Sequence, residues 1–192
     1  MKGWRSVENA VMRLIPERAR EPSTAFGRLG DVVQQPPVWL GLGGALALGG
    51  GPRGHRAAWR GSIGYAVAAV VANLVIKPVV GRSRPPGAGK GKAGPITSSF
   101  PSGHAATDLA FSLGASLELP LLFVPLSAAT AAAHWSVVRS RGHYPSDVFA
   151  GGVVAVVVTL AVWKLWPPRR PPGDDEPSDD ELAGRSLGPP ER

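Results

Sequence analysis

Two histidine-containing turns carry the residues best suited to chemistry. In the second turn, His143 is followed four residues later by Asp147, at the start of a predicted helix. A carboxylate beside one ring nitrogen fixes the tautomer of an imidazole and leaves the other nitrogen as a nucleophile. In a Ser-His-Asp triad the carboxylate orients the histidine in the same way, but here no serine is involved. His143 is therefore the candidate nucleophile, and Asp147 is the residue expected to orient it.

The first turn, PSGH at positions 101–104, precedes an apolar helix. The start of a helix offers free backbone N–H groups and a positive dipole end, which favours an anion. Gly103 lets the backbone approach a ligand closely, while Ser102 either donates a hydroxyl hydrogen bond or caps the helix. His104 would lie beside the anion and protonate a leaving oxygen. Asp108 either orients this imidazole or lines a polar cavity.

Two cations precede this turn at a spacing of seven residues. Lys77 and Arg84 would project from nearly the same face of a continuous helix, unless Pro78 kinks it. Two cations on one face can grip a single phosphate, Arg through its bidentate fork. The alternative is a snorkelling Lys followed by an ordinary loop Arg.

Five apolar segments must position these residues, at 38–51, 62–80, 104–119, 121–138 and 146–166. A helix that spans a bilayer needs about 20 apolar residues, so only the second and the last segments are long and apolar enough to be predicted as spans directly. The others qualify if their polar residues face a bundle interior; the alternative is the buried helices of a soluble domain. The favoured fold is all-α, a polytopic transmembrane bundle with about five membrane helices. Their order brings the two histidine turns, Lys77 and Arg84 to one side of the membrane.

The chain divides into three parts. Residues 1–35 form an amphipathic N-terminal segment, which is expected to lie on the membrane surface or to pack on the bundle. Its apolar side chains recur at helical spacing: Trp4, Val7, Val11, Leu14 and Ile15. Residues 36–166 are the membrane domain, and the Pro-rich, acidic tail at 167–192 is expected to be disordered.

Charge and composition narrow the function. Residues 1–166 carry 17 Lys and Arg against 7 Asp and Glu, a net charge of +10. This charge suits an anionic membrane surface or a phosphorylated substrate, whereas nucleic acid is disfavoured because the basic residues lie between apolar runs. The sequence has no cysteine and four histidines. We expect no metal and no cofactor, because the cations near the candidate site would repel a metal ion.

The order of these motifs resembles a known signature. The motifs are Lys77 followed after six residues by Arg84 and Pro85, then PSGH at 101–104, then Ser136, His143 and Asp147. They resemble the three-part signature of the type 2 phosphatidic acid phosphatase family, whose superfamily also includes vanadium haloperoxidases and bacterial acid phosphatases. The match covers residues ~60–165.

The resemblance implies a role for each matching residue. His143 attacks phosphorus and becomes phosphorylated, with Asp147 orienting it, and His104 is the general acid that releases the alcohol. Water then hydrolyses the phosphohistidine. The phosphate oxygens would be held by Lys77, Arg84, Ser102 and the amide of Gly103.

One position departs from the family pattern. Where the family has an Arg six residues before the nucleophilic His, this chain has Val137. Arg139 and Arg141 are the candidates to replace it. On a continuing helix, Arg141 shares the face of Val137, whereas Arg139 points almost the opposite way, so Arg141 is favoured.

These observations predict a multi-pass enzyme of the inner cell membrane that hydrolyses a lipid phosphate. The bias towards Ala, Gly, Arg and Val favours a polyprenyl phosphate, a polyprenyl diphosphate or a polyprenyl-linked sugar phosphate, while phosphatidylglycerol phosphate and phosphatidic acid stay open. Two alternatives remain: a vanadium haloperoxidase, and a non-catalytic lipid-phosphate binder or transporter.

The expected partners are the bilayer and the lipid substrate, and a homo-oligomer is left open. The distribution of Lys and Arg favours a cytoplasmic site.

Overall fold

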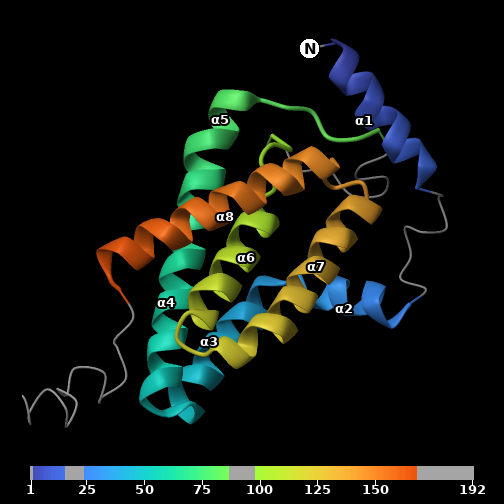
Figure 1. Cartoon of the computed structure of the whole chain (residues 1–192). Helices are drawn as coiled ribbons and strands as arrows, with labels where there is room; N and C mark the ends of the chain where they lie inside the picture. Colours follow the sequence, from blue (N-terminus) through green and yellow to red (C-terminus); the bar gives the residue numbers. More distant parts are fainter. Residues whose placement is uncertain (1, 16–23, 87–97, 168–192) are drawn as a thin grey trace, which may run out of the picture.

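The structure is a computed structural model that describes residues 2–15, 24–86 and 98–167. The part of the chain that it describes is all-α, as predicted, and has no strand (Figure 1). The helices in chain order are α1 (Lys2–Leu14), α2 (Ala25–Val33), α3 (Pro36–Gly49), α4 (Gly51–Val70), the π-helical η2 (Val71–Ile76), α5 (Lys77–Val80), α6 (Gly103–Ser116), the short 3-10 helix η3 (Pro120–Leu122), α7 (Phe123–Arg139) and α8 (Pro145–Leu165). The predicted disordered tail lies outside the described residues, apart from Pro167.

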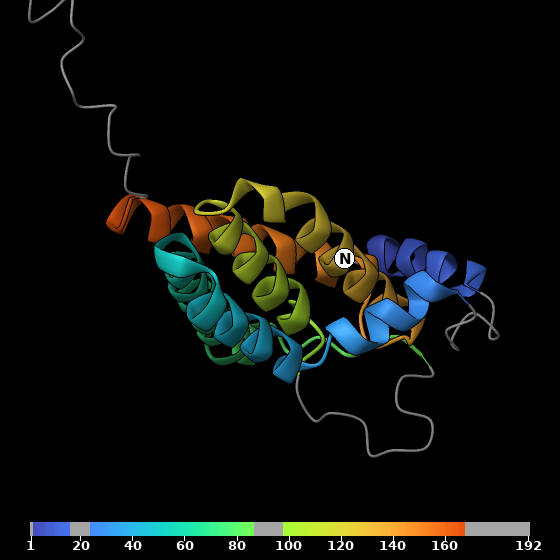
Figure 2. The ribbon, with the colours of Figure 1, turned by 90° about the horizontal axis from the view of Figure 1, so that it is seen from below.

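Helix α6 is the centre of the bundle. It packs against α4, α7 and α8, and Figure 2 shows it enclosed among the other helices. Its small side chains, among them Ala106 and Ala110, are fully buried, which lets the neighbouring helices approach closely. A close approach to the start of α6 is at Gly151 of α8, where an added Cβ would lie 2.5 Å from the carbonyl oxygen of Ser102. The start of α6 is therefore held against the first turns of α8.

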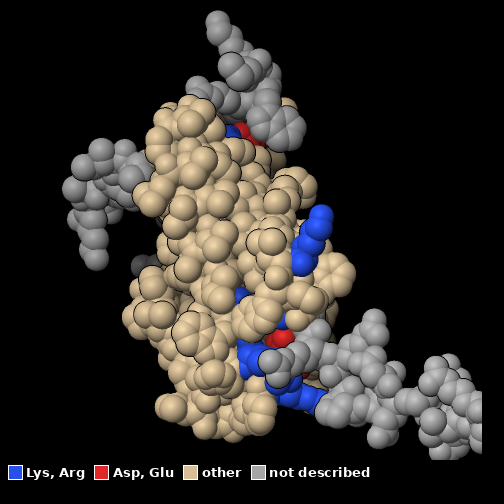
Figure 3. Space-filling model, turned by 90° about the vertical axis from the view of Figure 1, so that its left-hand side faces the viewer, with Lys and Arg blue, Asp and Glu red and all other residues tan. Residues whose placement is uncertain are grey.

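Within the described residues, three helical segments are long and apolar enough to cross a membrane: Gly51–Val80, Pro120–Arg139 and Pro145–Leu165. The structure thus shows three candidate spans where about five were predicted. Helices α3 and α6 have 14 residues each, which corresponds to about 21 Å, shorter than a hydrocarbon core of about 30 Å. Figure 3 shows a long face of the molecule with few charged side chains between its two ends, as a multi-pass membrane protein requires.

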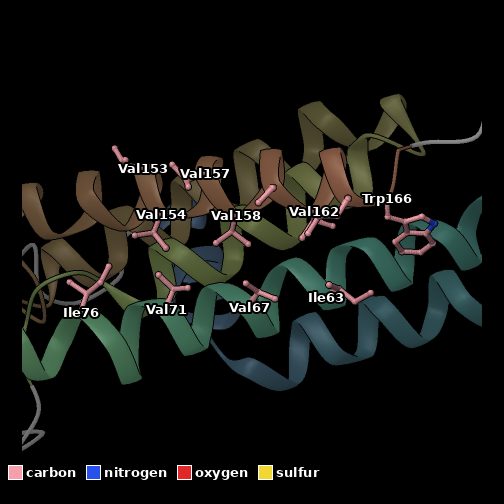
Figure 4. A pocket seen from close by; sticks show the side chains of 12 residues that line it. Ile63, Val67, Val71, Ile76, Val153, Val154, Val157, Val158, Val162 and Trp166 are labelled. Atoms are coloured by element: carbon pink, nitrogen blue, oxygen red, sulfur yellow. The ribbon is translucent and has the colours of Figure 1, made fainter.

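A groove of about 620 Å³ runs between α4 and α8. Figure 4 shows Val154, Val158 and Val162 of α8 facing Ile63 and Val67 of α4 across it. All the residues that line it are apolar or aromatic. Such a surface is compatible with lipid chains and carries no group for chemistry.

Helix α1 docks on the bundle. Met12 of α1 is buried against Val138 and Tyr144. On the same helix Val7 and Leu14 are 55% and 82% exposed, so part of the apolar face remains uncovered. Helix α2 packs separately against α7. Contact between α1 and a membrane surface stays a prediction.

A buried ion-pair cluster of Arg56, Arg60 and Glu118 lies at the end of the bundle where α4 begins and α6 ends. The carboxylate of Glu118 lies 3.0 Å from Nε of Arg56 and 3.0 Å from Nη2 of Arg60. Arg60 is only 1% exposed, and its guanidinium lies 4.9 Å from the ring centre of Trp166. The cluster ties the first half of α4 to the segments that follow α6 and α8.

Candidate active site

A cavity of about 460 Å³ opens at the end of the bundle where α6 and α8 begin, in the upper part of Figure 1. Five of the predicted site residues line it: Lys77, Arg84, Gly103, His104 and His143. They come from the end of the long α4–α5 helix, from the loop after it, from the first turn of α6 and from the loop before α8. The structure therefore gathers residues from distant parts of the chain around one space, as the order of the helices predicts.

Lys77 is held in place by a residue that the sequence analysis did not single out. Its Nζ donates a hydrogen bond of 2.5 Å to Oδ1 of Asn73, one turn earlier in the π-helical segment η2. Asn73 also lines the cavity. A Cβ on Gly103 would lie 2.7 Å from Asn73 Oδ1 and 3.3 Å from Lys77 Nζ, so a larger residue would displace this pair. A lone polar residue in an apolar run is a signal of function in membrane helices, and π-helical turns are frequent at functional sites.

Arg84 reaches the cavity by a different route from the one predicted. The helix ends at Val80, where Gly81 adopts a left-handed conformation with φ of 58°. Arg84 therefore lies in the following loop and does not share a helical face with Lys77, because the helix does not continue far enough. Its Nη1 donates to the carbonyl oxygen of Gly142 at 2.5 Å. Its Nε is buried and has no hydrogen-bond partner among the described residues.

His143 is buried, with one ring nitrogen bonded and the other directed at Arg84. Its Nδ1 lies 2.7 Å from the carbonyl oxygen of Ser99. A carbonyl oxygen only accepts hydrogen bonds, so Nδ1 carries the proton and the lone pair is on Nε2. Nε2 lies 3.4 Å from Arg84 Nη1. Burial lowers the pKa of His143 below its ordinary value; Arg84 acts in the same direction, whereas Asp147 and the Ser99 carbonyl oppose it.

Asp147 lies beside His143 but bonds mainly to other groups. Its Oδ2 is 3.7 Å from His143 Nδ1, an ion-pair distance rather than a hydrogen bond. The same oxygen accepts from the backbone N–H of Tyr144 at 2.9 Å, and Oδ1 accepts from Arg82 Nη1 at 2.8 Å. The Asp147 carboxylate is completely buried. The imidazole is therefore oriented by direct bonding to Ser99 and by the nearby negative charge of Asp147.

Ser102 and Asp108 do not line the cavity. Ser102 is fully buried, and its Oγ accepts from the backbone N–H of Ala105 at 3.3 Å, the capping role that was the alternative to phosphate binding. Asp108 is 1% exposed, and its Oδ1 accepts from the Thr107 hydroxyl at 3.0 Å. Among the described contacts of Asp108, none joins its carboxylate to His104.

Neither candidate replacement for the family arginine enters the cavity, whereas Val137 lines it. Arg139 is buried and pairs with Asp31 of α2. Arg141 follows the end of α7 with a φ of 59°, and its Nη2 donates to the carbonyl oxygen of Met12 at 3.1 Å. This left-handed turn ends the helix on which the choice of Arg141 depended. Among the described residues that line the cavity, Lys77 and Arg84 are the Lys and Arg side chains.

Within the described ranges, no group of three or more His, Asp or Glu side chains is arranged to hold a metal ion.

The profile of the PAP2 superfamily matches residues 59–171, and the chain belongs to this superfamily, whose members include phosphatases. The match contains every residue that lines the cavity except Gln34 and Pro36. Among solved structures, the chain is similar to the first transmembrane PAP2 type phosphatidylglycerolphosphate phosphatase from Bacillus subtilis. The two share 16% sequence identity with a TM-score of 0.61, over 86% of this chain and 87% of that one, which shows a common fold. No curated protein matches the sequence.

Proposed function

We propose that the chain is a membrane lipid phosphatase that transfers phosphate from a lipid to His143 and then to water. The observation that carries this proposal is the cavity in which Lys77, Arg84, His104 and His143 meet. Two cations can hold a phosphate while a neutral imidazole faces the phosphorus. Membership of the PAP2 superfamily supports the same chemistry.

In the first step, Nε2 of His143 attacks phosphorus and a nitrogen–phosphorus bond forms as the bond to the lipid oxygen breaks. His104, which lines the same cavity, gives its proton to the leaving oxygen. The imidazole of His143 then carries positive charge, which the buried carboxylate of Asp147, 3.7 Å from Nδ1, stabilises. The carbonyl oxygen of Ser99 keeps the Nδ1 proton in place throughout.

In the second step, water attacks the phosphohistidine. His104 now lacks its proton and takes one from the water, so that the nitrogen–phosphorus bond breaks and inorganic phosphate forms. The histidines return to their starting states. No oxidant, reductant or further reactant is required.

The membrane arrangement supports a lipid substrate. In this proposal α3, α4–α5, α6, α7 and α8 cross the inner membrane, and α1 lies on its surface. Helix α6 is short but is almost entirely covered by other helices, so it does not have to match the bilayer thickness on its own. The cavity would then lie at the level of the lipid headgroups, with the apolar chain of the substrate among the helices.

The lipid class is the finer part of the proposal. The similar Bacillus subtilis protein is named as a phosphatidylglycerolphosphate phosphatase, and the composition of this chain favours polyprenyl phosphates or diphosphates. Phosphate release should be measured in detergent with EDTA present, using polyprenyl phosphate, polyprenyl diphosphate, phosphatidylglycerol phosphate and phosphatidic acid. We expect release from at least one lipid, with the polyprenyl substrates fastest and with no loss on adding EDTA.

The replacement of the family arginine by Val137 favours a second candidate, a lipid-phosphate binder or transporter that lacks catalysis. The same panel separates the two. Release of phosphate that His143→Ala abolishes supports the phosphatase. Binding of the lipids without release by the unaltered chain would replace the phosphatase with the binder.

A further inference from the structure

Arg82 connects helix α1 to the candidate nucleophile His143 and its neighbour Asp147, although Arg82 lies outside the cavity. Its Nη1 donates hydrogen bonds of 2.8 Å to Oδ1 of Asp147 and 2.8 Å to Oγ of Ser146. Its guanidinium carbon lies 4.4 Å from the ring centre of Tyr144, a cation–π contact. Each of these partners belongs to the turn that follows His143. Arg82 therefore holds the loop that carries the nucleophile.

Glu8 of α1 holds Arg82 from the other side. The Glu8 carboxylate accepts a hydrogen bond from Arg82 Nη2 and another from the hydroxyl of Ser146. Glu8 is 5% exposed, although it lies on a helix whose Val7 and Val11 are exposed. A buried carboxylate is costly unless it is paired and hydrogen-bonded. The two bonds at one carboxylate define a specific docking site for α1.

The same arginine also supports the second group that orients the nucleophile. The backbone N–H of Arg82 donates to Oγ of Ser98 at 2.9 Å. In return, the backbone N–H of Ser99 donates to the carbonyl oxygen of Arg82 at 2.8 Å. Ser99 is the residue whose carbonyl oxygen binds His143. Displacement of Arg82 would therefore disturb both contacts that fix the imidazole.

The net charge of Glu8, Arg82 and Asp147 favours the proposed reaction. Two buried carboxylates, Glu8 and Asp147, share the single guanidinium of Arg82. The cluster therefore keeps an excess of negative charge close to His143, which becomes positive when it accepts the phosphoryl group. In a buried site such a charge is screened little by water.

We propose that Glu8 and Arg82 are positioning residues for His143 and Asp147, so that helix α1 is a working part of the active site. This inference rests on the proposed phosphatase function. Neither residue lines the cavity, so both act through Asp147 and the loop before α8. Their loss should lower kcat without weakening the hold on phosphate.

The test compares Glu8→Gln, Arg82→Gln and the double variant in the full chain, with Arg82→Lys as the conservative change. Arg56→Gln is the matched control, because it breaks an ion pair at the opposite end of the bundle. For each variant, kcat with the lipid phosphate of the panel that the wild type hydrolyses fastest and the inhibition constant for inorganic phosphate are measured, together with thermal stability.

We expect kcat to fall about 10-fold or more in Glu8→Gln and in Arg82→Gln, the scale of a lost hydrogen bond to a charged group. The inhibition constant for phosphate should stay within about twofold, because Lys77 and Arg84 are unchanged. The double variant should be no worse than Arg82→Gln alone, since both residues act in one network. Arg82→Lys should recover part of kcat, and Arg56→Gln should keep all of it.

An unchanged kcat in Glu8→Gln would overturn the inference. A parallel loss of kcat and phosphate binding would also overturn it, since this result indicates general loosening of the fold. If Glu8→Gln fails to fold, kcat and the inhibition constant for phosphate are compared between Arg82→Lys and Arg82→Gln. Equal kcat values in the wild type and Arg82→Gln would then overturn the inference. A wild-type chain without phosphatase activity would overturn the proposed function and the inference together, whereas an active wild type with an unaffected Glu8→Gln overturns the inference alone.

Discussion

The carbonyl oxygen of Ser99 lies 2.7 Å from Nδ1 of His143, whereas the nearest carboxylate oxygen of Asp147 lies 3.7 Å from the same atom. The backbone therefore sets the tautomer of the imidazole, and the carboxylate contributes its charge. The orientation of the imidazole and the pKa of His143 therefore depend on different groups. Removal of the Asp147 charge should alter the pKa of His143 while Nε2 remains directed at the cavity.

Asp147→Asn should move the acidic limb of the kcat/KM profile to lower pH. His143 must be unprotonated to attack, so this limb follows its pKa in the free enzyme. Burial already lowers that pKa, and the carboxylate of Asp147 raises it again, so removing the carboxylate lowers it further. The other charged or titratable groups that face the imidazole are Arg84, which also lowers the pKa, and Lys77 and His104 across the cavity. The measurement is kcat/KM between about pH 4 and 8 for wild type and variant; a limb that stays in place or moves to higher pH contradicts the assignment.

Gly103→Ala should reduce activity because the added methyl group would collide with the Asn73–Lys77 pair. The new Cβ would lie 2.7 Å from Asn73 Oδ1, so the Asn73 amide must shift, and its hydrogen bond to Lys77 would change. We expect a loss of about 10-fold or more in kcat/KM and a decrease in stability of about 1–3 kcal/mol. Gly152→Ala is the matched control, since the nearest atom to its Cβ would be 3.8 Å away. Equal activities for the two variants would remove Gly103 from the site.

Arg84→Lys should lower kcat/KM by about 100-fold even though the charge is kept. Lysine lacks the planar guanidinium, which can contact the Gly142 carbonyl through Nη1 and offer its other N–H groups to a phosphate. The measurement is the steady-state rate with a short-chain lipid phosphate, compared with Arg53→Lys at an exposed position on α4. Full activity in Arg84→Lys would show that charge alone is sufficient there.

Glu118→Gln should destabilise the fold without changing the chemistry. The substitution leaves the buried Arg60 without its carboxylate, which typically costs about 3–5 kcal/mol. We expect a lower midpoint of thermal unfolding in detergent with kcat per folded molecule unchanged, because this cluster lies at the far end of the bundle. A fall in kcat with an unaltered midpoint would link the two ends in a way that the present contacts do not explain.

The sequence was a good guide where residue type and spacing decide the structure. The apolar segments predict the helices, and their order brings Lys77, His104 and His143 to one end. The number of membrane-spanning helices was less predictable, because α3 and α6, with 14 residues each, are too short for length and composition to show whether they cross. A shared helical face for Lys77 and Arg84 required the helix to continue to Arg84, but Gly81 ends it.

The contacts that depend on tertiary packing were beyond prediction. The hydrogen bond from His143 to Ser99 uses a backbone carbonyl, which no side-chain pattern reveals. The preference for Arg141 depended on a continuous helix, whereas the turn at that residue directs its side chain to the end of α1. The pairing of Arg82 with Glu8 joins residues 74 positions apart, which spacing along one helix cannot indicate.

The most direct test of the proposed chemistry is to identify the residue that carries the phosphoryl group. The chain is mixed with a lipid phosphate, quenched in alkali within milliseconds to preserve phosphohistidine, digested and analysed by peptide mass spectrometry. We predict one phosphoryl group on His143, absent from His143→Ala, which should also lose phosphate release. Full phosphate release by His143→Ala, or a phosphoryl group on another residue, would contradict the proposal.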